Sequence, residues 1–320
     1  MHLHPARSNR RTTATVAAFC LGAALLGAAT PASAAGRDAS ASLVPVAVPA
    51  AQPSDAVAYW TAERRAAATD DDASGDATTG SAAASDAATE EFATSDAART
   101  DDHAEQVATV SHIGRIYYEQ EGFGHYCSAN VVDSANGSTI ATAGHCVTRD
   151  QTFSTKMVFY PQYESGPSAY GVWPVVGGNV TTGWYQRNDA DQAEDTAFMA
   201  VARDGDGQTV ASVVGSTPVL FDQPAAQLAS AYGYPAVGRF DGEHLDRCTG
   251  SGTAQGTTQI VLACDMTGGA SGSPIFAGAG SDGAQFANVA DLDYAGTHNI
   301  GALWQESARS AYDLTAAISS

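Results

Sequence analysis

From about position 107 onward, hydrophobic and polar residues form short β-prone runs separated by turns. Runs rich in β-branched and aromatic residues predict strands at 110–118, 127–132, 138–143, 156–160, 196–201, 259–264 and 274–276. Turn residues separate neighbouring runs, as at Glu121-Gly122-Phe123-Gly124 and Asn136-Gly137. Only 306–318 looks helical, with Ala308, Ala311, Tyr312 and Leu314 at helix-like spacing. This pattern favours an all-β barrel or sandwich with a short C-terminal helix.

The first hundred residues have a different pattern. Residues 1–34 predict a secretory signal peptide, with early arginines, a short apolar core over 16–29 and the small-residue end Ala32-Ser33-Ala34. That core is too short to span a membrane, which takes about 20 residues. Residues 35–105 are rich in Ala, Asp, Thr and Ser and poor in large apolar side chains, so burial cannot offset the entropy of ordering them.

We interpret residues 35–105 as an acidic low-complexity propeptide or linker. The alternative is a disordered arm that stays attached. One island, Tyr59-Trp60-Thr61-Ala62-Glu63-Arg64-Arg65, differs in composition and is compatible with a short docking helix. The remaining residues, 106–320, are numerous enough to build a sizeable core.

Charge and cysteine content narrow the function classes. The formal net charge of −20 argues against nucleic acid or an anionic membrane as partner and suits a soluble secreted protein. Removal of Cys20 with the signal would leave four cysteines, and an even number in a secreted chain indicates disulfides. A zinc site is the alternative, but the chain has no Cys-x-x-Cys pair and its histidines are scattered. No metal and no cofactor are predicted.

Two small-residue blocks carry the candidate chemistry. They are Thr142-Ala143-Gly144-His145-Cys146 and Gly268-Gly269-Ala270-Ser271-Gly272-Ser273-Pro274, and Asp195 opens an apolar run between them. A serine hydroxyl is a poor nucleophile at neutral pH unless a base takes its proton and a buried acid orients that base. His145, Asp195 and Ser271 supply one residue of each type, in the order base, acid, nucleophile.

The two blocks and their order resemble the trypsin/chymotrypsin-like serine endopeptidases, from about Val107 to the C-terminus. The second block looks most like the bacterial secreted branch that includes the glutamyl endopeptidases. The resemblance implies two six-stranded antiparallel β-barrels, over about 106–205 and 206–320, with the active site in the cleft between them. It also implies a Cys127–Cys146 disulfide beside the histidine, which leaves Cys248–Cys264 as the second pair. The backbone N–H groups of Gly269 and Ser271 would form the oxyanion hole.

Each catalytic candidate has rivals nearby. Asp189, Asp191 and Glu194 lie close to Asp195 but look solvated, and Ser273 is interpreted as a packing residue before Pro274. An esterase nucleophile elbow would need glycine at position 273 and would leave only His298 as its histidine. The histidines without a comparable setting are expected to pack or to face solvent: His112, His125, His244 and His298.

The specificity pocket is the least determined part of the sequence. Asp265 lies six residues before Ser271, where trypsin-like enzymes carry the acid that selects Arg or Lys; its alternative role is to cap a loop. In the glutamyl endopeptidases a histidine precedes the tryptophan of a similar stretch, but here Leu303 precedes Trp304. Met266 stands where a threonine or serine would be expected. Glutamate specificity is therefore not predicted.

The sequence therefore predicts a secreted, monomeric serine endopeptidase that acts on proteins or peptides and binds neither nucleic acid nor, after signal removal, a membrane. The alternative is a catalytically silent secreted binding protein with the same fold. Ala270 precedes the nucleophile where chymotrypsin-type zymogens carry an aspartate. We therefore expect no activation through insertion of a new N-terminal ammonium beside Ser271.

Overall fold

The computed structural model describes residues 44–47, 52–70, 103–166 and 168–320. The predicted signal peptide, 1–34, lies outside these residues. Two antiparallel sheets account for nearly all of the strands, and the topology is the two-barrel architecture expected from the sequence.

The first barrel is closed by hydrogen bonds. Its six strands are β4 (Ile113–Gln120), β5 (Phe123–Val131), β6 (Thr139–Thr142), β9 (Thr155–Pro161), β10 (Trp173–Val180) and β11 (Ala197–Val201). They follow the order β10-β11-β6-β5-β4-β9, and β9 pairs back onto β10 with Trp173 opposite Phe159. Closure leaves no edge strand within this set of six, and their inward side chains form one apolar core.

The second barrel is a curved sheet in the order β15-β18-β17-β16-β12-β13. Its strands are β12 (Leu228–Gly233), β13 (Asp246–Ser251), β15 (Gln259–Ala263), β16 (Pro274–Ala277), β17 (Gln285–Leu292) and β18 (His298–Leu303). Short strands extend the two ends, β14 (Thr253–Gln255) beside β15 and β3 (Glu105–Gln106) beside β13. Between β13 and β15, both fully described, no strand pairing forms, but the Cys248–Cys264 disulfide connects them. We call this line the seam.

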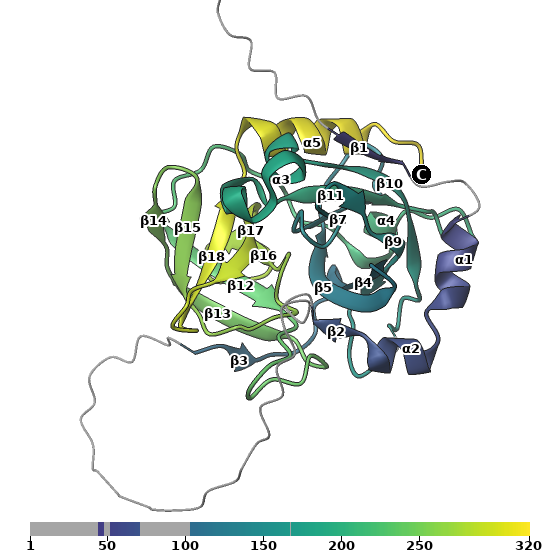
Figure 1. The fold of residues 1–320 in the computed structure, drawn as a ribbon, viewed down its shortest axis with the longest axis horizontal. Helices are drawn as coiled ribbons and strands as arrows, with labels where there is room; N and C mark the ends of the chain where they lie inside the picture. The colour runs from purple at the N-terminus through teal and green to yellow at the C-terminus, as the bar shows by residue number, and fades with distance from the viewer. Residues whose placement is uncertain (1–43, 48–51, 71–102, 167) are drawn as a thin grey trace, which may run out of the picture. The chain divides into compact units, whose positions relative to one another are not determined.

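The C-terminal helix belongs to barrel two in sequence but packs on barrel one. Helix α5 (Glu306–Ala316), drawn in yellow in Figure 1, lies against β10 and β11. The Thr315 hydroxyl bridges them, since it donates to the carbonyl of Phe198 and accepts from Asn179. The remaining small elements are the hairpin of β7 (Thr148–Arg149) and β8 (Thr152–Phe153), helices α3 (Thr182–Arg187) and α4 (Val210–Val214), and a 3-10 helix (Asn188–Glu194).

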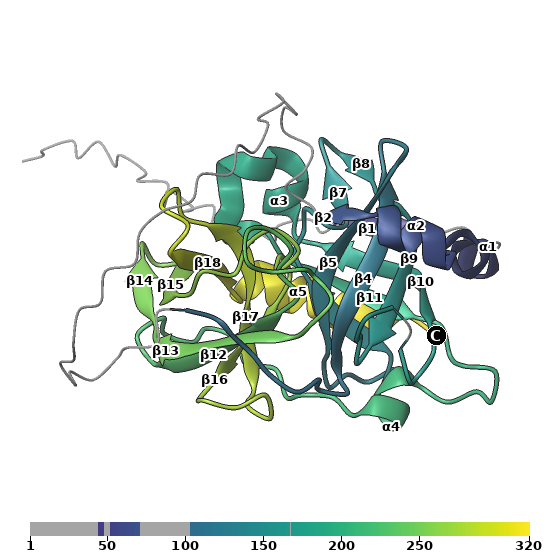
Figure 2. The ribbon, with the colours of Figure 1, turned by 90° about the horizontal axis from the view of Figure 1, so that it is seen from below.

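An N-terminal segment, residues 44–47 and 52–70, covers the outside of barrel one. It contains β1 (Val44–Ala47), α1 (Gln52–Tyr59), α2 (Ala62–Ala67) and β2 (Thr69–Asp70). Figures 1 and 2 both show its helices beside the first barrel, where α1 contacts β9 and β10. Trp60, 2% exposed, lies between the helices, and its indole N–H donates to the carbonyl of Lys156 at 2.6 Å. The island therefore does dock, but as the end of α1, the link between the two helices and the first part of α2.

All seven predicted strands are present, with ends displaced by a few residues, and so is the C-terminal helix. The pattern missed the strands that lack a strong β-branched run, among them β10, β12, β13 and β17. The predicted boundary at 205/206 falls between β11 and β12. Among the described helices, none combines the length and apolar content that crossing a membrane requires.

Candidate active site

His145 lies in the tight loop after β6. The loop needs glycine at 144, because a Cβ there would lie 2.6 Å from the ring of Trp184 and 2.9 Å from Oδ1 of Asp195. The loop closes on itself as Val147 and Thr148 donate their N–H groups to the carbonyl of Gly144. Glycine in this block thus lets the backbone lie close to the ring of Trp184 and the carboxylate of Asp195.

Asp195 holds His145 through two hydrogen bonds. Its Oδ2 lies 2.6 Å from Nδ1 of the imidazole, and its Oδ1 accepts from the His145 backbone N–H at 2.8 Å. Asp195 is 1% exposed and stands just before β11, so its carboxylate is fixed and shielded from water. A buried acid on Nδ1 sets the tautomer that leaves Nε2 to act as a base.

Asn288 of β17, which the sequence analysis did not select, holds Asp195 from barrel two. Its amide N–H donates to the Asp195 carbonyl at 2.8 Å, and its Oδ1 accepts from Thr196 at 2.8 Å and from the Trp304 indole at 2.9 Å. The available signal was a lone amide in the apolar run 286–290. Trp304, expected in the specificity pocket, thus supports Asn288 instead.

The rival acids lie in other environments. Asp189 is exposed, and Asp191 pairs with Arg187 four residues earlier. The sequence suggested that Glu194 is solvated, but it is half-buried. Burial raises its pKa above the ordinary value, and Ser307 donates a hydrogen bond to it. The acid bonded to Nδ1 of His145 is Asp195.

Ser128 of β5 fastens the Ser271 loop to barrel one. Its N–H donates to the carbonyl of Ser271 at 2.8 Å, and its hydroxyl donates to the carbonyl of Gly269 at 2.9 Å. Gly272 has φ +78°, and a Cβ there would lie 2.3 Å from the Thr142 hydroxyl. The second glycine block therefore lets the loop lie directly on the strands that lead to His145.

Ser271 and Ser273 differ in access. Ser271 is 8% exposed and lines a cavity, whereas Ser273 is fully buried, with its hydroxyl against Gly233. Around Ser271, the N–H groups of Ala270 and Gly272 donate to the carbonyls of Thr267 and Val289. The oxyanion hole of Gly269 and Ser271 N–H groups stays a prediction.

Two cavities flank the residues 290 and 291 of β17. The first, about 10 Å³, is lined by residues 266–268, Ser271, residues 289–292 and Asn299. The second, about 70 Å³, includes His145, Trp184 and Asp195 in its wall. Because Ala290 and Asp291 line both, the Ser271 cavity and the His145 cavity are neighbours.

Of the residues expected in the specificity pocket, only Met266 lines the Ser271 cavity. Leu303 lies in the core of barrel two. Asp265 turns away and accepts hydrogen bonds from Arg239 and from the Ala104 N–H, the latter at 2.7 Å. Burial acts to raise the pKa of Asp265, but these bonds hold it below its ordinary value. Its position fits the loop-capping alternative. The sequence analysis missed the wall formed by residues 289–292 of β17. It had selected Leu303 and Trp304, which lie on and after the next strand, β18.

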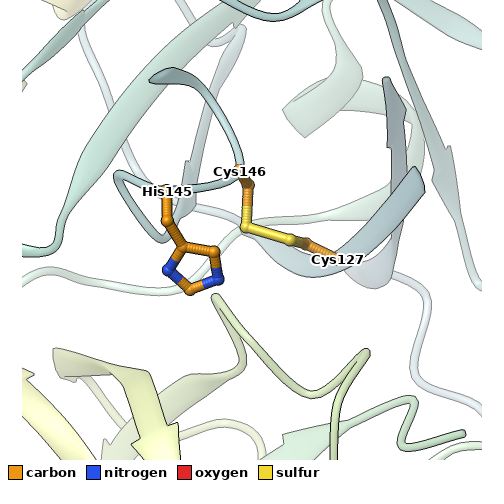
Figure 3. A group of neighbouring side chains, drawn as sticks. All are labelled: Cys127, His145 and Cys146. Atoms are coloured by element: carbon orange, nitrogen blue, oxygen red, sulfur yellow. A yellow bond between two sulfur atoms is a disulfide. The ribbon is translucent and has the colours of Figure 1, made fainter. Parts of the chain in front are cut away.

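Both expected disulfides are present, Cys127–Cys146 and Cys248–Cys264. Figure 3 shows the first of them on one side of the His145 loop while the imidazole projects from the other. The sulfur atoms and a ring nitrogen lie within 4.8 Å of one another, as in a metal site. Sulfurs joined in a disulfide are not thiolates, however, so this group has no zinc-ligand set.

Solved structures match this fold over nearly the full length of the matched chains. A thermostable serine protease, AL20, from an extremophilic microorganism is 36% identical, with TM-score 0.61, over 64% of this chain and 97% of that one. Protease Anisep from Arthrobacter nicotinovorans is 33% identical, with TM-score 0.63, over 67% of this chain and 100% of that one. The chain belongs to the trypsin/chymotrypsin-like serine proteases.

A Glu endopeptidase shares the fold at 20% identity and TM-score 0.55, over 68% of this chain and 98% of that one. No protein-family model and no curated protein matches the chain. Membership of the family makes this chain a serine endopeptidase.

Proposed function

We propose that this chain is a secreted endopeptidase that hydrolyses peptide bonds through His145, Asp195 and Ser271. The observation that carries the proposal is the pair of hydrogen bonds that Asp195 accepts from the backbone N–H and the side chain of His145. An acid with 1% exposure, aimed at Nδ1 of a partly exposed histidine, has no evident structural necessity, but a general base requires it.

In the proposed reaction Nε2 of His145 takes the proton of Ser271 as Oγ attacks the substrate carbonyl carbon. The N–H groups of Gly269 and Ser271 stabilise the oxyanion, which is worth about 10²–10³ in rate for each donor. The C–N bond then breaks, His145 returns its proton to the leaving amine, and an acyl-enzyme remains. Water attacks the acyl carbon by the same route and restores Ser271. Asp195 stabilises the imidazolium formed in both halves.

We further propose that residues 1–34 direct secretion and that residues 35–105 act as a propeptide. Two disulfides and a net charge of −20 suit an extracellular protein. Within 35–105, the described helices pack on barrel one rather than remaining an unstructured linker, and β3 pairs with β13 of barrel two. Such contacts fit a segment that assists folding of the protease domain.

The test compares two serines two residues apart. Ser271→Ala is expected to abolish labelling by a fluorophosphonate and to lower turnover of a peptide ester by about 10⁶, as for a lost triad member. Ser273→Ala is the matched control and should keep most of the activity, because its hydroxyl is buried away from the cavities. Absence of labelling in the unmodified enzyme would instead support the silent binding protein.

A further inference from the structure

Asn299, one of the residues that line the Ser271 cavity, has a buried side-chain atom without a hydrogen-bond partner. Asn299 of β18 is 1% exposed, and its Oδ1 has no donor among the described residues. Its Nδ2 donates to the carbonyl of Met266 at 2.8 Å. That bond fixes the amide orientation, because a flipped amide would set two oxygens against each other. The acceptor that lacks a partner is therefore the side-chain oxygen.

Apart from Ser271, the proposed nucleophile, the other polar side chains of the cavity wall, Thr267 and Asp291, have partners. The Thr267 hydroxyl donates to the carbonyl and accepts from the N–H of Val237. Asp291 accepts from the Leu292 N–H at 2.8 Å and from Gln192 at 2.6 Å. A buried acceptor without a donor is unfavourable, so a ligand that supplies a donor to Asn299 would be favoured.

The charge of the cavity wall excludes one class of ligand. None of the described residues that line it is basic, and Asp291 contributes a carboxylate. A carboxylate entering this cavity would face both Asp291 and the Asn299 oxygen without a cation to pair with. The volume, about 10 Å³, holds about one water-sized group, so only the tip of a side chain fits there.

We propose that this cavity receives the P1 side chain, the residue on the acyl side of the cleaved bond, and selects an uncharged amide over a carboxylate. Asn299 is the specificity-determining residue, and its Oδ1 accepts a hydrogen bond from the P1 amide N–H. The inference rests on the proposed role of Ser271, since the acyl group must lie beside the nucleophile. It separates this enzyme from the glutamate specificity named for one of its structural neighbours.

The experiment uses two matched pairs of peptide substrates, identical except for P1: glutamine against glutamate and asparagine against aspartate. In each pair the amide substrate is expected to have a kcat/KM at least about a hundredfold higher, because sites built to pair a polar group strongly reject a mismatched isostere. Equal values, or a preference for the acid, would overturn the proposal. Fluorophosphonate labelling of the same preparation separates this failure from failure of the proposed nucleophile.

A variant then tests Asn299 itself. Asn299→Ala should lower kcat/KM for the amide substrates by about tenfold, the effect of one lost hydrogen bond, while a P1 alanine substrate keeps its rate. An equal fall for amide and alanine substrates would mean that Asn299 acts only in the fold and would overturn its role. The profile of the unmodified enzyme decides the substrate class even if this variant does not fold.

Discussion

The two barrels are closed in different ways. Barrel one closes through strand pairing between β9 and β10, and the N-terminal segment covers its outer wall. Barrel two has no strand pairing across the seam between β13 and β15, where Cys248–Cys264 provides the covalent link. Barrel one carries His145 in the loop after β6 and Asp195 directly before β11, whereas barrel two contributes Ser271 from a loop and the pocket wall from the end of β17. The comparison indicates that barrel one carries His145 and Asp195, with Asn288 of barrel two bonded to Asp195, and it predicts that barrel two depends on its disulfide.

The two disulfides provide a matched test because they span similar separations, 19 and 16 residues. The chain-entropy model gives both about 3 kcal/mol of stability. Replacement of Cys127 and Cys146 by alanine should also lower turnover, by about 10²-fold, because the disulfide positions the loop of His145.

Replacement of Cys248 and Cys264 should instead cost more in stability than in turnover, because no strand pairing joins β13 to β15 across the seam. Denaturant unfolding and peptide-ester turnover measure the two effects, with folding checked by circular dichroism. If both double variants lose activity and stability in the same ratio, the distinction between the barrels is wrong.

The attachment of the N-terminal segment to barrel one can be tested at Trp60, which is buried against it. Trp60→Ala should lower the free energy of opening of the N-terminal segment by about 3–5 kcal/mol, through the lost aromatic burial and the cavity that remains. Amide hydrogen exchange over residues 52–70 in the Ser271→Ala background measures this, since that background prevents self-digestion. Val57→Ala is the control, because Val57 is 36% exposed on the same helical pair. Equal loss of protection in both variants would show that Trp60 does not anchor the segment.

The smallest expected effect concerns the acid that begins β13, one of the two strands at the seam. Asp246 is 7% exposed, and burial, with Asp241 and Asp265 adding to it, raises its pKa to about 6. The ordinary pKa of aspartate in the unfolded state is about 3.9. Between that pH and about pH 6, Asp246 therefore keeps its proton in the native state and has lost it in the unfolded state. Stability from this group is present at low pH and is lost as pH rises from about 4 to about 6.

Asp246→Asn cannot ionise, so it should be more stable than the unmodified chain above pH 6, and the difference should disappear below about pH 4. Unfolding curves across this range, in the Ser271→Ala background, measure the difference. Asp241→Asn is the control: backbone and His244 hydrogen bonds outweigh burial and lower the pKa of Asp241, so no gain is expected there. A gain that persists unchanged at pH 4 would contradict the assignment to ionisation.

The sequence by itself determined the features that depend on residues close together in the chain. The glycines around His145 and Ser271 mark close backbone approaches, and the structure places Gly144 and Gly272 within 3 Å of neighbouring groups once a Cβ is added. Asp195 could be chosen over its rivals because it opens a buried run, and burial is encoded locally by the residues that follow. β-branched runs located seven strands, since side-chain packing on a pleated surface favours them.

The tertiary structure decided what depends on register and on contacts between distant strands. Asn288 lies 93 residues from Asp195, and no local pattern links them. The pocket wall proved to be residues 289–292 of β17 instead of the similar stretch on β18, because strand pairing, rather than motif, sets which strand lies beside Ser271. Asp265 occupies a position typical of a pocket acid, yet Arg239 and the Ala104 N–H draw its carboxylate away. A side chain's direction follows from its partners, and those partners meet only once the chain has folded.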